Sequence, residues 1–154
     1  MKKIDLQIGS YTSVCPITIS PQDTCQFALD ITKARGIRHF PVVEDKRVVG
    51  IVSQRDLNVA HSFEPLTKIE QVMSKDPYCV KKTAQMGKVA LEMSARKIGS
   101  AIVSEENGTL YGIFTVTDAL NCLVEVLRGD LDEYSMGDPE VVNGVKVGEQ
   151  QANP

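Results

Sequence analysis

Hydrophobic positions change their spacing along the chain in a definite order. Over residues 17–19 apolar and polar side chains alternate, which is typical of a short strand, and the next apolar positions follow the spacing of a helix. Two apolar runs, 40–43 and 47–53, then flank a charged turn and predict paired strands, and a helical pattern resumes at Asp56. The predicted order is strand, helix, strand, strand, helix. The apolar face of the first helix comprises Phe27, Ala28, Ile31 and Ala34.

The same order returns in the second half of the chain. Two apolar runs, 101–103 and 110–114, predict strands joined around Asn107-Gly108, a dipeptide that accepts the positive φ angles of a tight hairpin turn. The helix before them is expected to present one apolar face, formed by Met86, Ala90 and Met93.

The ends of the two first helices differ. Gly36 is well placed to end the earlier helix in the left-handed conformation. The second copy has no glycine between Lys97 and Ile98, so we expect its helix to end differently.

One motif closes the second hairpin strand in both copies. Gly50-Ile-Val-Ser53-Gln-Arg-Asp56 and Gly112-Ile-Phe-Thr115-Val-Thr-Asp118 share a glycine, an apolar residue, a hydroxyl and an Asp three positions later. The two Asp residues lie 62 positions apart, and further segments match at nearly the same offset. Such a repeat indicates two copies of one supersecondary unit. Each copy would be marginal alone, so we expect the copies to share a core.

This pattern resembles the cystathionine β-synthase (CBS) domain, two copies of which form a Bateman module. The resemblance covers residues 8–128 and implies an α/β fold in which two β-α-β-β-α repeats pack as a pseudo-two-fold pair. We place repeat 1 at residues 1–66, repeat 2 at 67–128 and an acidic, disordered tail at 129–154. Residues 67–73 predict one or two helical turns that link the repeats. The resemblance rests on the segments 16–21 and 36–43, the two motif endings, Val72-Met73 and Pro77.

The repeated ending suits a nucleotide. A hydroxyl at the start of a helix lies beside free backbone N–H groups and the positive end of the helix dipole, where a phosphate binds well. An Asp one turn later can accept hydrogen bonds from both hydroxyls of a ribose. The alternative is a structural N-cap, because Ser53 and Thr115 are good capping residues and Asp is favourable in a first turn. The duplication favours a nucleotide. The resemblance implies an adenosyl one: AMP, ADP or ATP, with S-adenosylmethionine or NAD as alternatives and no other cofactor.

The resemblance implies that each repeat completes the cleft of the other. The primary cleft would comprise Thr12, Ile17, Ile37, Arg38, His39, Ile113, Thr115 and Asp118. The second cleft would comprise Ile51, Ser53, Asp56, Met73, Tyr78, Ile98, Gly99 and Ser100.

The first of these clefts ranks higher because Arg38 and His39 would give a phosphate charge-assisted hydrogen bonds. The second offers Gly99 and Ser100 at those positions, and Tyr78 would either crowd the base or stack on it. For Arg38 a solvated surface charge, and for His39 a structural hydrogen bond, are equally good interpretations.

Acidic residues are concentrated at the end of the chain. Six carboxylates against Lys146 alone give residues 129–154 a net charge of −5, which leaves +2 on residues 1–128 out of a total of −3. A mildly basic body suits an anionic small ligand. It lacks the dense basic face expected of a nucleic-acid binder, so nucleic acid is not the expected ligand.

Other classes of protein find little support in the sequence. The cysteines at 15, 25, 79 and 122 show no C-x-x-C spacing, so we expect reduced thiols and no metal site. No Ser-His-Asp or Cys-His-Asp order and no P-loop is evident, so we expect no catalytic residues. No apolar run approaches the ~20 residues that span a bilayer, and Met1-Lys-Lys-Ile-Asp lacks the apolar core of a signal peptide. We therefore expect a cytoplasmic protein without a membrane partner.

The last predicted helix, 118–128, is apolar on more than one face, which predicts burial against a second subunit. The sequence thus predicts a regulatory module that binds an adenosyl nucleotide and signals to an unknown effector protein through conformation or homodimer assembly. One alternative is a CBS-type scaffold without a ligand. The other, an enzyme, would need a nucleophile or base in a cleft, for which only Cys15, Cys79 or His39 lie in suitable segments.

Overall fold

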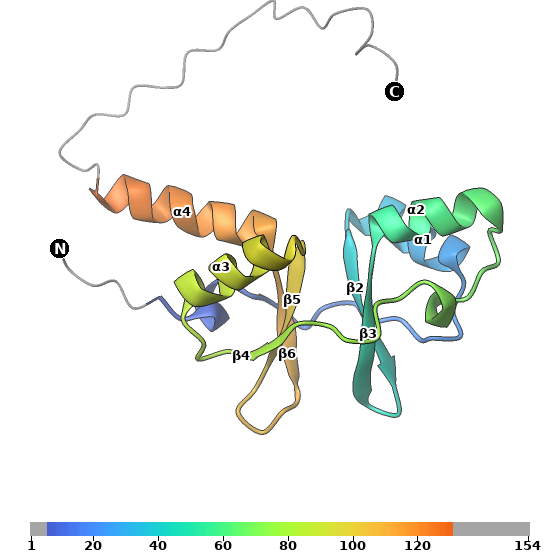
Figure 1. The fold of residues 1–154 in the computed structure, drawn as a ribbon, viewed down its shortest axis with the longest axis horizontal. Helices are drawn as coiled ribbons and strands as arrows, with labels where there is room; N and C mark the ends of the chain where they lie inside the picture. The colour runs from blue at the N-terminus through green and yellow to red at the C-terminus, as the bar shows by residue number, and fades with distance from the viewer. Residues whose placement is uncertain (1–5, 131–154) are drawn as a thin grey trace, which may run out of the picture. The chain divides into compact units, whose positions relative to one another are not determined.

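The computed structural model describes residues 6–130 (Figure 1). The chain divides into two units, residues 1–122 and 123–154, and all of the strands among the described residues belong to the first. Most of the predicted acidic tail lies outside the described residues. Its first two residues, Gly129 and Asp130, continue the last helix.

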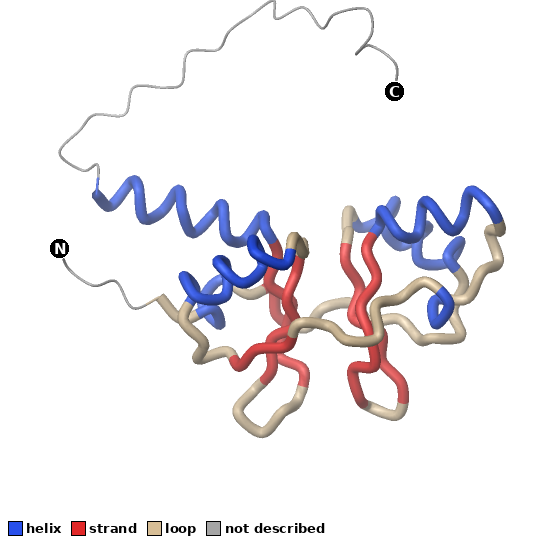
Figure 2. The backbone as a smooth tube through the Cα atoms, in the orientation of Figure 1, coloured by secondary structure: helices blue, strands red, loops and turns tan. Residues whose placement is uncertain are grey.

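Both copies contain a hairpin with helices before and after it (Figure 2). A 3₁₀ turn precedes each of them: η1 (Ile8–Tyr11), followed by strand β1 (Ser13–Val14), and η2 (Ile69–Gln71). The first copy then has α1 (Cys25–Arg35), β2 (His39–Glu44), β3 (Arg47–Ser53) and α2 (Gln54–Phe63). The second has β4 (Cys79–Lys81), α3 (Met86–Arg96), β5 (Ser100–Ser104), β6 (Leu110–Thr115) and α4 (Val116–Asp130). The order of sheet strands is β1-β6-β5-β4 in one sheet and β2-β3 in the other.

The strand predicted at residues 17–19 is reduced to one isolated bridge. The Ile19 N–H donates to Pro41 O at 3.1 Å, and Ile19 O accepts from the Val43 N–H at 2.8 Å. The next donor in such a parallel ladder would be Pro21, which has no N–H, so the pairing stops. The prediction of a strand here was therefore wrong, although Ile19 itself is buried.

Helix α1 buries a different face from the predicted one. Cys25, Ala28 and Thr32 are buried, whereas Phe27 is 48% exposed and Ala34 is exposed. Thr32 tolerates burial because its hydroxyl donates to Ala28 O at 3.1 Å. A polar residue that satisfies itself on its own helix is invisible to a hydrophobic pattern, and this shifted the predicted face.

The helix ends are alike, contrary to expectation. Gly36 ends α1 with φ 69°, and its N–H bonds to Thr32 O, as predicted. Lys97 ends α3 in the same left-handed conformation, with φ 56° and ψ 38°. The prediction of a different ending was wrong: the Lys97 N–H reaches the Met93 and Ser94 carbonyls, which offsets the steric cost of a side chain there.

The hairpin turns and the link between the copies agree with prediction. Gly108 has φ +85° between β5 and β6, and its N–H bonds to Glu105 O at 3.0 Å. Between β2 and β3, Asp45 and Lys46 both have positive φ. The link at 67–73 contains the turn η2.

The two 3₁₀ turns are exchanged between the copies. In η1, the Ile8 N–H donates to Ala84 O of the second copy at 2.9 Å, and β1 pairs with β6. In η2, the Ile69 N–H donates to Asp23 O of the first copy at 2.9 Å. Ile8 and Ile69 are both fully buried by this exchange. Each copy thus completes the other's packing, while the domain boundary at 66/67 stays a prediction.

The motif glycines permit this crossing. A Cβ on Gly50 would lie 2.7 Å from Met73 Sδ and 2.7 Å from Ser74 O. A Cβ on Gly112 would overlap Ser13 O and the Thr12 methyl group. The entering segment of one copy therefore passes over the hairpin strand of the other at a position where only glycine fits.

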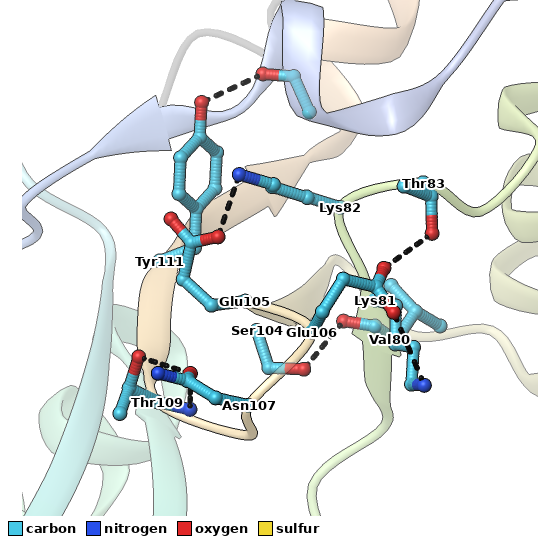
Figure 3. A network of polar contacts seen from close by, with 11 residues as sticks. Val80, Lys81, Lys82, Thr83, Ser104, Glu105, Glu106, Asn107, Thr109 and Tyr111 are labelled. Carbon is cyan, nitrogen blue, oxygen red and sulfur yellow. Dashed lines mark hydrogen bonds and ion pairs between the residues drawn. The ribbon is translucent and has the colours of Figure 1, made fainter.

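A polar network fastens η1 to the second hairpin (Figure 3). The Tyr111 hydroxyl donates to Gly9 O at 3.4 Å, and the Lys82 ammonium lies 5.3 Å from the centre of the Tyr111 ring. Lys82 also pairs with Glu105 at 2.6 Å. Tyr111 of β6 thus contacts η1 directly, and Lys82, which follows β4, contacts both Tyr111 and Glu105.

Candidate functional site

Both motif endings form capping boxes at the start of a helix. The Ser53 N–H and hydroxyl donate to Asp56 Oδ2 at 3.3 and 2.6 Å, and the Asp56 N–H donates to Ser53 Oγ at 3.3 Å. The Thr115 N–H and hydroxyl donate to Asp118 Oδ2 at 2.7 and 2.9 Å. The N-cap interpretation is therefore correct as local structure. It leaves nucleotide binding open, because these capping contacts use only one oxygen of each carboxylate.

The Asp118 cavity, of about 680 Å³, joins the end of β6 to segments of repeat 1. This volume falls within the range of small-molecule sites. Seven of the eight residues predicted for the primary cleft line it. Thr12 does not: its hydroxyl donates to Ile8 O at 2.8 Å, and its methyl lies over Gly112. The lining residues are Ser13, Cys15, Pro16, Ile17, Gly36, Ile37, Arg38, His39, Gly99, Ile113, Thr115, Val116, Thr117 and Asp118.

The Asp56 cavity, of about 730 Å³, joins the end of β3 to segments of repeat 2. Seven of the eight residues predicted for the second cleft line it. Met73 is the exception, because its side chain packs over Gly50 and borders a different hollow. The lining residues are Arg38, His39, Ile51, Ser53, Gln54, Arg55, Asp56, Ser74, Asp76, Pro77, Tyr78, Arg96, Lys97, Ile98, Gly99, Ser100 and Val116.

Arg38 and His39 line both cavities, so the reason for ranking the Asp118 cavity first does not hold. The two residues lead into β2, where His39 pairs with Ser53 across the hairpin. This pairing brings them to the Asp56 motif of their own repeat as well as to the opposite one. Sequence spacing shows which segments meet but not that one side chain reaches two hollows.

His39 lies half-buried between the two cavities. Burial lowers the pKa of His39 below its ordinary value, Asp56 acts to raise it and Arg38 acts to lower it. The imidazole is therefore neutral at neutral pH and able to gain a proton when an anion arrives. A Cβ on Gly99 would lie only 3.0 Å from His39 Nε2.

The Asp56 cavity contains further cations that sequence reasoning missed. Arg55, Arg96 and Lys97 line it, together with the carboxylate of Asp76. Arg96 pairs with Glu92 at 2.6 Å and stacks 4.7 Å from the centre of the Tyr78 ring. Arg96 and Lys97 directly precede Ile98, which was predicted to contact the ligand. Their position in the sequence could therefore have revealed them.

The CBS domain profile matches residues 8–60 and 69–125, the two repeats of the fold. The chain belongs to the CBS domain family. Its internal duplication is therefore a tandem pair of CBS domains, and the fold and family inferred from the repeated motif are confirmed.

A curated relative is the inosine-5'-monophosphate dehydrogenase of Korarchaeum cryptofilum, 33% identical over 102 residues. The match covers 66% of this chain and 21% of that protein, so the chain spans about a fifth of the length of such relatives. The dehydrogenase activity of the longer protein is not transferred to this chain by a match of that extent.

Solved CBS structures share the fold. A protein of Vibrio cholerae assigned to acetoin utilization (AcuB) is 30% identical, with a TM-score of 0.76, and the match covers 83% of this chain and 98% of that one. CBSX2, solved with AMP, is 20% identical (TM-score 0.68; 79% and 98% covered). The MJ0100 domain pair, solved with methylthioadenosine and S-adenosylmethionine, is 22% identical (TM-score 0.70; 82% and 99% covered).

Within residues 6–130, no group of three or more His, Cys, Asp or Glu side chains is arranged to hold a metal ion. None of the described helices combines the length and apolar character needed to cross a membrane.

Proposed function

We propose that this CBS pair is a sensor that binds adenosyl nucleotides in its two cavities and passes the signal on through conformation or assembly. The observation that carries the proposal is the duplicated site: each cavity contains a hydroxyl and an Asp at the first turn of a helix, facing segments of the other repeat. The proposal includes a cytoplasmic location and an effector protein, and it includes no turnover of the ligand.

The chemistry of each cavity supports a nucleotide. The positive end of the helix dipole at the start of α2 and α4 favours a phosphate, and Arg38 adds a guanidinium. The second carboxylate oxygen of Asp56 or Asp118 suits a ribose hydroxyl. Apolar side chains for the base come from Ile17, Ile37 and Ile113 in one cavity and from Ile51, Tyr78 and Ile98 in the other.

The ligands of similarly folded pairs support an adenosine group. One such structure holds AMP, and another holds methylthioadenosine and S-adenosylmethionine. AMP, ADP, ATP, S-adenosylmethionine and NAD are accordingly the ligands to test. Because each cavity takes walls from both repeats, a ligand would stabilise the relative arrangement that closes around it, and this shift in population is the proposed signal.

Thermal unfolding tests the proposal. A ligand that binds only the folded chain stabilises it by about 2.7 kcal/mol at a hundred times its dissociation constant, so AMP or ATP should raise the melting temperature measurably. The double variant Asp56→Ala/Asp118→Ala is the matched control and should lose most of the shift. If no adenosyl ligand at millimolar concentration moves the wild-type transition, the proposal is refuted.

An assembly scaffold is the second candidate, because helix α4 exposes a set of large apolar side chains. Such a surface is typical of a protein interface, and a second copy of this chain is the expected occupant. A homodimer is compatible with both candidates, whereas a scaffold alone predicts no response to nucleotides. The exposed residues are Val116, Leu120, Leu123, Val124 and Leu127.

A further inference from the structure

The two repeats do not supply equal chemistry to the space between them. By the internal alignment, Arg38 and His39 of repeat 1 correspond to Gly99 and Ser100 of repeat 2. A symmetric pair would contribute one Arg–His set to each cavity. This chain has a single set, and Arg38 and His39 both line the Asp56 cavity as well as the Asp118 cavity.

Gly99 makes this sharing sterically feasible. His39 Nε2 would lie 3.0 Å and Cε1 3.4 Å from a Cβ at that position, so a side chain on residue 99 would press on the imidazole. Gly99 also lines both cavities. Because Gly99 has no side chain, the His39 imidazole has room beside it, where both residues line both cavities.

The shared Arg38 cannot give two phosphates its best geometry at once. A guanidinium that binds one phosphate through two parallel N–H bonds turns its planar fork toward that phosphate, which leaves a less favourable geometry for a phosphate in the other cavity. We propose that the two cavities compete for the single Arg38–His39 pair, so that a phosphate bound in one cavity weakens the binding of a phosphate in the other. This inference rests on the proposed function, since it assumes that both cavities take nucleotides.

The two cavities differ in the cations that remain available when Arg38 binds a phosphate in the other cavity. The Asp56 cavity keeps Arg55, Arg96 and Lys97, whereas no other lysine or arginine stands among the described residues that line the Asp118 cavity. A phosphate in the Asp118 cavity therefore depends on the shared pair. By thermodynamic linkage the weakening is reciprocal and equal in both directions.

Calorimetric titration of the full chain with AMP and, separately, with adenosine tests the competition. Asp56→Ala and Asp118→Ala each leave one cavity intact and report its intrinsic affinity. For adenosine, which has no phosphate, the wild-type isotherm should equal the sum of the two single-cavity isotherms. For AMP, the second equivalent should bind the wild type about tenfold more weakly than that sum predicts, or about 1.4 kcal/mol.

Arg38→Gln separates sharing from a general conformational effect. The side chain of Arg38 is exposed, and its backbone carbonyl bonds to the Gln54 N–H at 2.7 Å, so the variant should fold. AMP should bind this variant more weakly but additively. Additive AMP binding to the wild type, coupling that persists in Arg38→Gln, coupling seen equally with adenosine, or only one cavity that binds would each overturn the inference. Failure of both ligands to bind at all would instead overturn the proposed function.

Discussion

The Asp56 and Asp118 cavities are built from the same backbone parts but carry different charges. Each has a crossing glycine, a capping hydroxyl and an Asp at the start of a helix. Four lysine and arginine side chains and two carboxylates line the Asp56 cavity, against one arginine and one carboxylate in the Asp118 cavity. The two repeats thus share the backbone frame of the cavity, whereas unrepeated side chains set the charge of each cavity.

Helix α4 exposes five large apolar side chains, whereas α2, the last helix of repeat 1, exposes two, Val59 and Phe63. Val124 of α4 is 44% exposed, and in a dimer it would be covered. Replacing Val124 with Glu would bury an unpaired charge and should weaken association on the order of several kcal/mol. Sedimentation at micromolar concentration should show a dimer for the wild type and a monomer for this variant.

Asn121→Glu is the matched control, because it places the same charge on the same helix at an exposed polar position. It should remain dimeric. A wild-type chain that sediments as a monomer would remove the basis for this prediction.

The crossing glycines should respond unequally to the same change. Gly112→Ala would press a methyl group against the Ser13 carbonyl, whereas at Gly50 part of the obstruction is the flexible end of Met73. We expect a loss of about 1–3 kcal/mol in the free energy of unfolding from overpacking, larger at Gly112. Urea denaturation measures both variants.

Gly87→Ala provides the reference for this series, because an added Cβ in that part of α3 would meet nothing within 4 Å. It should raise stability by about 0.5–1 kcal/mol. Equal tolerance of alanine at all three glycines would show that the crossing is not tight.

A triphosphate should distinguish the cavities by charge. Asp56→Ala should weaken ATP binding more than Asp118→Ala, because the extra cations Arg55 and Lys97 favour ATP in the Asp56 cavity. The difference should be severalfold and shrink in 0.5 M salt, which screens exposed charges. Adenosine binding should show no such order, and a stronger effect of Asp118→Ala on ATP would restore the original ranking of the clefts.

The smallest effect on stability is expected at the two left-handed helix ends, Gly36 and Lys97. Lys97→Gly removes a side chain from a left-handed position and should stabilise the ligand-free chain by up to about 1 kcal/mol. Gly36→Ala introduces the same strain at φ 69° and should destabilise it by a similar amount. Opposite shifts in the urea midpoint are expected, and a loss of stability with Lys97→Gly would mean that the lysine side chain makes a compensating contact.

Much of this architecture could be predicted because the signals were local and repeated. The hairpins, the turn at Gly108 and the two motif endings each follow from a few neighbouring residues. The buried face of α1 could not, since Thr32 satisfies its own hydroxyl on the helix. Nor could the ending at Lys97, where two backbone carbonyls offset an unfavourable conformation.

The candidate site was also predictable only in part. Seven of eight residues in each predicted cleft line one cavity, because the resemblance already joined the right segments. The double role of His39 was missed, since its imidazole lies beside Gly99, a position without a side chain that is distant in the sequence. Thr12 and Met73 were misplaced because they serve the crossing at the motif glycines instead.

On the ribosome, η1 is made long before the hairpin that holds it. Gly9 and Tyr111, which are joined by a hydrogen bond, stand 102 residues apart in the chain. At a synthesis rate of roughly 5–20 residues per second, the turn waits about 5–20 s for its partner. During that interval Ile8, fully buried in the finished fold, has no hairpin to cover it. Ile8 is therefore open to a chaperone or protease until the second hairpin has been made.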